Sequence, residues 1–74
     1  MFEKSNLKKK IKECKQNIED LEKKRARSEA ALVTALLNGS VPNDDDVEYF
    51  NSFTSKIDEE RTRMQEYKRL LDQL

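Results

Sequence analysis

The 74-residue chain has no histidine and no tryptophan, and it has only one cysteine, one glycine and one proline. A single cysteine cannot form an internal disulfide, and the sequence lacks the histidine or second cysteine of a common zinc site. It also lacks a glycine-rich phosphate loop. Cys14 falls at an apolar position of a helical pattern, which indicates a buried thiol and not a nucleophile. We therefore expect no catalytic residue, no metal and no cofactor, in a protein that is not an enzyme.

Long hydrophobic runs are also absent. No segment approaches the roughly 20 apolar residues that a membrane-spanning helix needs, and the first residues lack the apolar core of a signal peptide. The single cysteine fits a reducing compartment. We expect no membrane span and a cytoplasmic location.

Charge is what the chain has in abundance. Charged residues make up 41% of the sequence and hydrophobic residues 35%, a composition typical of coiled coils and long helices. Residues 1–38 contain ten Lys/Arg and six Asp/Glu, whereas residues 39–74 contain five and nine. Acidic residues are interleaved with the basic clusters of the first half, so these clusters indicate a solvated helix face and not a nucleic-acid site.

The only glycine and the only proline lie close together, between two helix-favouring segments. Gly39 can adopt the left-handed conformation that often ends a helix, and Pro42 cannot continue that helix. Asn43 or Asp44 can cap a second helix, and the acidic residues that follow suit its first turn. The spaced ligands and central glycine of a calcium loop are missing here. The sequence predicts one domain over residues 1–74, with a helix over about 5–38, a corner over 39–43 and a helix over about 44–74.

Both predicted helices carry apolar residues at alternating spacings of three and four, which is the heptad pattern of a coiled-coil seam. The first seam comprises Leu7, Ile11, Cys14, Ile18, Leu21, Leu32 and Ala35, with the polar residues Arg25 and Ser28 continuing the phase between Leu21 and Leu32. The second comprises Phe50, Phe53, Ile57, Met64, Tyr67, Leu71 and Leu74, with Glu60 between Ile57 and Met64. Facing residues of an antiparallel hairpin have a constant sum of residue numbers. A sum of 85 pairs every a position with a d position and places Arg25 opposite Glu60. We predict an all-α, two-helix antiparallel coiled-coil hairpin whose register is set by Arg25 and Glu60.

A second apolar stripe follows the far side of the first helix near the corner. Two helices bury little surface, so we expect the hairpin to be completed by a partner or by oligomerisation. The residues expected to bind the partner are Ala26, Ala30, Val33, Leu36 and Leu37, extended from the second helix by Val47 and Tyr49. The alternative is that the alanines only favour helix formation.

The order of these features resembles a known family. Leu36-Leu37-Asn38-Gly39, the polar corner and Tyr49-Phe50 near the start of the second helix resemble the small hairpin co-chaperones of type III secretion needle subunits. The resemblance implies a bacterial cytoplasmic hairpin that supports a larger helical-repeat chaperone holding the needle subunit. The stripe on the first helix would then be its docking face. The alternative function is a homo-oligomeric structural or regulatory adaptor in which two hairpins form a four-helix bundle.

Overall fold

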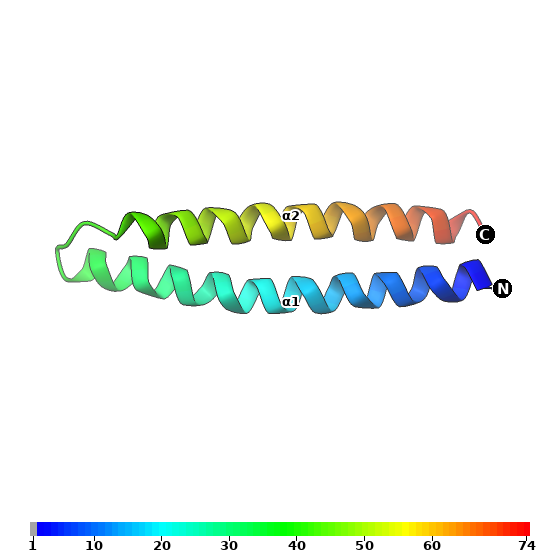
Figure 1. Cartoon of the computed structure of the whole chain (residues 1–74), viewed down its shortest axis with the longest axis horizontal. Helices are drawn as coiled ribbons and strands as arrows, with labels where there is room; N and C mark the ends of the chain where they lie inside the picture. The colour runs from blue at the N-terminus through cyan, green and yellow to red at the C-terminus, as the bar shows by residue number, and fades with distance from the viewer. Residues whose placement is uncertain (1) are drawn as a thin grey trace.

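The computed structural model describes residues 2–74, and over these residues the chain forms two antiparallel helices (Figure 1). Helix α1 spans Phe2–Leu37 and α2 spans Asp44–Asp72. Together they form a rod of 57 × 15 × 14 Å with the two termini at one end and the corner at the other. The prediction of an all-α helical hairpin is confirmed. The first helix begins three residues earlier than expected, and Met1 lies outside the described residues.

Helix α1 ends in a Schellman motif centred on Gly39, which has a φ of 71°. The Gly39 N–H donates to the carbonyl of Leu36 at 3.1 Å, and the Ser40 N–H donates to the carbonyl of Ala35 at 2.8 Å. These two bonds satisfy carbonyl groups that the end of a helix leaves free. The left-handed conformation at Gly39 reverses the chain there, as its position after Leu37 predicts.

Helix α2 begins at Asp44 because Asn43 caps it. The Asn43 backbone is extended, and its side-chain oxygen accepts a hydrogen bond from the Asp45 N–H at 2.9 Å. Asp44, Asp45 and Asp46 follow in the first turn, where the positive end of the helix dipole favours negative charge. The predicted cap is confirmed, with Asn43 as the capping residue.

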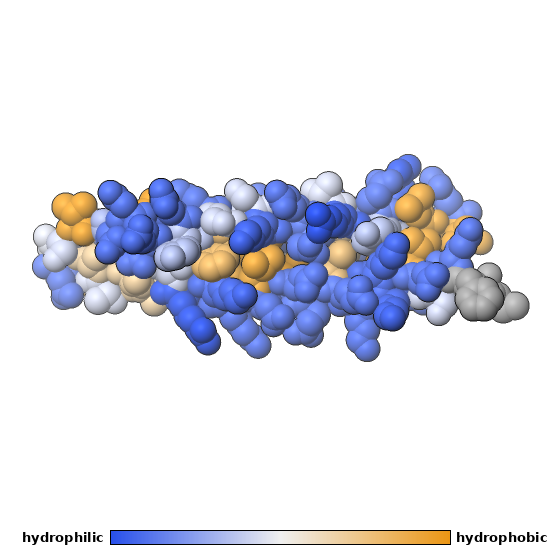
Figure 2. Space-filling view, viewed as in Figure 1, coloured by the Kyte–Doolittle hydropathy of each residue, from blue (hydrophilic) through white to orange (hydrophobic). Residues whose placement is uncertain are grey.

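The predicted seams are the surfaces that the two helices bury against each other. Ile11, Cys14, Ile18 and Ile57 are buried, and Ile57 is 0% exposed. All other predicted seam positions are partly covered except Leu74, which remains exposed. Figure 2 shows hydrophobic residues along the line where the helices meet, with hydrophilic residues on both sides.

The predicted register is wrong by one heptad. The Asn17 side-chain nitrogen donates to Glu60 at 3.4 Å, and the Lys10 ammonium lies 5.4 Å from the centre of the Tyr67 ring. The residue numbers in both pairs sum to 77. The nearest sum of residue numbers that pairs a positions with d positions is 78, whereas the predicted sum is 85.

This shift separates the two residues that were expected to set the register. Glu60 lies at the level of Ile18, and its carboxylate accepts hydrogen bonds from Arg63 at 2.7 Å and from Asn17. Arg25 lies at the level of Phe53, one heptad from Glu60. The expected Arg25–Glu60 pair is therefore replaced by contacts of Glu60 with its own helix and with Asn17.

The position of the chain reversal explains the shift. A sum of 85 places the centre of the corner between Pro42 and Asn43, whereas a sum of 78 places it at Gly39. Residues 40–43 follow this reversal and lead back to α2, which begins at Asp44 alongside α1 (Figure 1); Pro42 cannot continue a helix through this segment. The observed register also brings Leu7 to the level of Leu71, whereas the predicted one left Leu7 without a facing residue.

Candidate protein-interaction surfaces

The hairpin has two long edges, one on each side of the seam. We name the first the Arg61 edge, because Arg61 there donates to Glu22 across the helices at 3.2 Å. We name the second the Asn17 edge, because it carries the Asn17–Glu60 bond and the Lys10–Tyr67 contact. The Glu22–Arg61 ion pair is about half exposed, so it contributes little stability.

An exposed apolar surface lies near the corner, starting on the Arg61 edge and continuing around the outward face of α1. We name it the corner patch and define it as Ala26, Ala30, Val33, Leu36, Leu37 and Val47, all of them exposed. Leu36 and Leu37 are 65% and 82% exposed. By helical periodicity the α1 residues of the patch form one continuous strip, and Leu36 faces Val47 across the seam in the same way that Glu22 faces Arg61. Six of the seven residues expected to bind a partner thus share one surface.

Tyr49 is the seventh expected residue, and it lies elsewhere. It is exposed, as predicted, but it lies two residues beyond Val47 and therefore points to the Asn17 edge. There its ring stacks on Phe53, with 6.3 Å between the ring centres and an angle of 20° between the rings. Tyr49 consequently does not extend the corner patch, because the seam separates the two.

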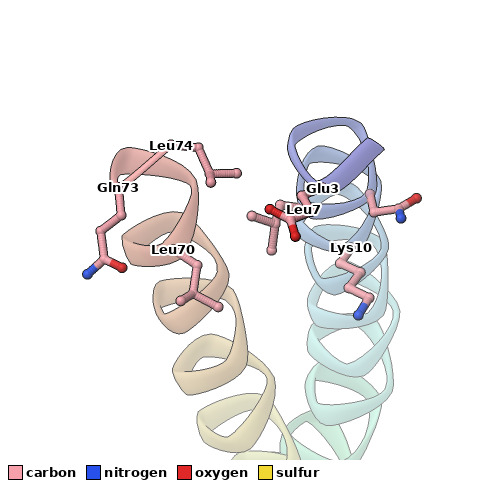
Figure 3. Close-up of a pocket in the computed structure, with 7 residues that line it drawn as sticks. Glu3, Leu7, Lys10, Leu70, Gln73 and Leu74 are labelled. Carbon is pink, nitrogen blue, oxygen red and sulfur yellow. The ribbon is translucent and has the colours of Figure 1, made fainter. Parts of the chain in front are cut away.

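A second apolar surface, not predicted from the sequence, lies at the opposite end of the rod. A groove of about 520 Å³ opens there on the Asn17 edge, and its lining residues are Glu3, Asn6, Leu7, Lys10, Leu70, Gln73 and Leu74. Figure 3 shows Leu7 and Leu74 pointing toward each other across the gap between the helix ends, with Leu70 below them. We name this surface the open-end groove. The sequence does contain a sign of this groove. Leu71 and Leu74 are seam positions, and Leu70 is an additional leucine that lies next to the seam.

The polar residues at the middle of the seam have a structural explanation. Cys14 is buried, and burial raises the pKa of its thiol; the Glu60 carboxylate beside it raises that pKa further. The Glu60 side chain is only 13% exposed, yet Asn17 and Arg63 satisfy its oxygens. Cys14 is thus a protonated thiol within the seam, which does not favour reaction as a nucleophile.

Two further observations concern the described residues as a whole. Within residues 2–74, no three side chains of the His, Cys, Asp or Glu type come together in a way that would hold a metal ion. Neither α1 nor α2 contains a stretch that is long and apolar enough to span a membrane.

Comparison with known proteins adds no assignment. No protein-family model, no curated protein and no solved structure matches this chain. The features that indicate a function are the two apolar surfaces, the charges around them and the resemblance described from the sequence.

Proposed function

We propose that the protein is a non-enzymatic interaction module that binds another protein through the corner patch. The observation that carries this proposal is the exposure of Leu36 and Leu37, at 65% and 82%, next to exposed Val33 and Val47. Covering a leucine side chain fully stabilises a complex by about 1.5–3 kcal/mol. A contiguous group of such side chains is characteristic of a binding surface.

The shape of the corner patch suits a helical partner. Ala26 and Ala30 are small and lie on the same outward face as Val33 and Leu37, so a partner helix can approach α1 closely there. The larger side chains at the corner would then anchor that helix in the manner of helix-in-groove recognition. We propose a helical protein as the partner for this reason.

The resemblance to needle-subunit co-chaperones supports a more specific form of the proposal. In this form the hairpin acts in the bacterial cytoplasm and supports a helical-repeat chaperone that holds a type III secretion needle subunit. The corner patch would be the surface that contacts the chaperone.

Co-production with such a chaperone and its needle subunit tests this form. We expect the hairpin to co-purify in a stoichiometric complex, and we expect Leu37→Glu to reduce its affinity for the chaperone at least about tenfold. Ser55→Glu is the matched control, because it adds the same charge at an exposed position of α2 away from the patch. Equal binding by all three proteins would refute the assignment of the patch. A tight closed dimer or tetramer of the hairpin, dissociated by Leu37→Glu, would instead support the homo-oligomeric adaptor.

A further inference from the structure

The rod carries opposite charges at its two ends. Residues 34–48, which form the corner end, contain four acidic residues and no basic residue, a net charge of −4. Residues 2–12 and 66–74, which form the other end, contain seven basic and three acidic residues, a net charge of +4. The residues between them contain eight of each sign. The molecule is therefore an electric dipole along its 57 Å length.

Each charged end also carries one of the two apolar surfaces. The corner patch lies at the negative end, with Asp44 and Glu48 nearby on α2. The open-end groove lies at the positive end, with Lys10 in its lining and with Lys8 and Lys9 next to Lys10 in the same turn of α1, outside the lining. The two ends are therefore complementary to each other in charge, and both present leucine side chains.

The two surfaces face different sides of the hairpin, and this decides how two copies can meet. The corner patch runs from the Arg61 edge around the outward face of α1, and the open-end groove is on the Asn17 edge. In a two-fold dimer of this kind, each copy would have to cover the patch of the other with its own groove. A second copy lying against one side of the rod cannot reach both surfaces, because the patch and the groove face different sides. A second copy in the same orientation, shifted along the rod axis and to the side of the patch, can bring its groove against the patch of the first.

We propose that copies of this protein associate head to tail, with the corner patch of one copy packed against the open-end groove of the next. The contact is heterologous, so one terminal copy keeps a free patch, the other keeps a free groove, and the assembly is open-ended. This inference goes beyond the proposed function, because it assigns a second occupant to the corner patch. Self-association and binding of a helical partner would then compete for the same leucines.

The contact is small, so we expect it to be weak and dependent on salt. Only the ends of the rods overlap, and stable interfaces bury about 800 Å² on each partner. The attraction between ends of charge −4 and +4 acts over a Debye length of about 10 Å at 0.1 M salt. We expect association at high protein concentration and low ionic strength, and dissociation as the salt concentration rises.

Sedimentation equilibrium of the purified chain tests the association. At about 20 mM NaCl the weight-average mass should rise continuously with concentration beyond that of a dimer, and at about 500 mM NaCl the dissociation constant should increase at least about tenfold. Leu37→Glu removes the patch and Leu74→Glu removes the groove. Each replaces an exposed leucine at an end of the fold, so neither should unfold the hairpin. Ser55→Glu is the charge-matched control and should associate like the unaltered chain.

Mixing the two variants distinguishes head-to-tail contact from other forms of association. The Leu37→Glu copy keeps a groove and the Leu74→Glu copy keeps a patch. An equimolar mixture should therefore form a 1:1 dimer and nothing larger, although each variant alone is monomeric. A closed patch-to-patch dimer would behave differently, since Leu74→Glu would leave it intact, and that result would overturn the proposal.

The outcome is independent of whether the proposed function is correct. If the unaltered chain binds a helical partner but stays monomeric at low salt and high concentration, the head-to-tail inference fails and the proposed function stands. If the chain self-associates as described but no partner competes for Leu37, the proposed function fails instead. Leu74→Glu should keep partner binding while losing self-association, whereas Leu37→Glu should lose both.

Discussion

The middle of the hairpin and its corner end are built from the same heptad pattern but differ in how much they bury. The four buried apolar side chains, Ile11, Cys14, Ile18 and Ile57, all lie away from the corner. Near the corner the seam residues, such as Leu32 and Phe50, are only partly covered. Outside the seam, Leu36 and Leu37 are exposed. The stability of the fold therefore comes mainly from the middle, while the corner end offers surface for binding.

The largest expected effect is the loss of stability when the buried middle is cut back. Ile57 is fully buried, so Ile57→Ala should lower the free energy of unfolding by about 2–4 kcal/mol through lost burial and a new cavity. Urea unfolding monitored by circular dichroism measures this change. In the corner patch, Leu37→Ala should change the free energy of unfolding by less than about 0.5 kcal/mol. Similar losses for both variants would contradict the division between middle and corner.

The register of the middle can be measured directly, because Cys14 is the only cysteine in the chain. In the observed register Met64 lies at the level of Cys14, whereas in the predicted register Leu71 would lie at the level of Cys14. Met64→Cys should form an intramolecular disulfide with Cys14 in a glutathione redox buffer, with an equilibrium constant on the order of 100-fold higher than that of Leu71→Cys.

A second measurement checks the same register without a disulfide. Arg25 and Glu60 are about 10 Å apart along the helix axes, given one heptad at 1.5 Å per residue. The effects of Arg25→Leu and Glu60→Leu on the free energy of unfolding should therefore add within about 0.5 kcal/mol. A larger coupling energy would indicate a direct contact between Arg25 and Glu60 and would contradict the observed register.

A smaller effect is expected from the cap that begins α2 at the corner. Asn43→Ala removes the acceptor for the Asp45 N–H and should lower the free energy of unfolding by about 1 kcal/mol. Ser40→Ala is the control at the same end, since Ser40 takes part in the corner through its backbone N–H. If the two variants were equally stable, the cap would not be a source of stability.

The smallest effect is a dependence of stability on alkaline pH. Burial, together with Glu60, raises the pKa of Cys14 in the folded chain. The unfolded thiol therefore loses its proton at a lower pH than the folded one, and stability should fall as the pH rises through and above the ordinary thiol pKa. Urea unfolding of the unaltered chain and of Cys14→Ala at neutral and alkaline pH measures the difference. If the variant showed the same decline, the thiol would not be its cause.

The sequence was sufficient for the elements and the seam, because both follow from local chemistry. Gly39 and Asn43 end and begin helices through bonds within a few residues, and the three-and-four spacing places residues such as Ile57 on the buried face. The register did not follow from the same reasoning, because a shift of seven residues again pairs a with d positions. The point of chain reversal decides between such registers, and the sequence alone allowed it anywhere from Gly39 to Asn43.

The candidate surfaces were predictable in part for a related reason. The strip from Ala26 to Leu37 lies on one helix, so its periodicity alone identifies it. Placing Tyr49 requires knowing which edge of α2 meets which edge of α1. The open-end groove combines Leu7 with Leu70 and Leu74, and only the correct register brings these residues together.

Both termini lie at the end of the rod that holds the open-end groove, 57 Å from the corner along the long axis (Figure 1). An affinity tag, a fluorescent label or a surface attachment at either terminus would therefore crowd the groove and leave the corner patch free. A protein immobilised through a terminus would present its corner end to the solution. If every copy carries such a tag, self-association through the groove should be lost while the corner patch stays free for a partner, without any substitution in the chain.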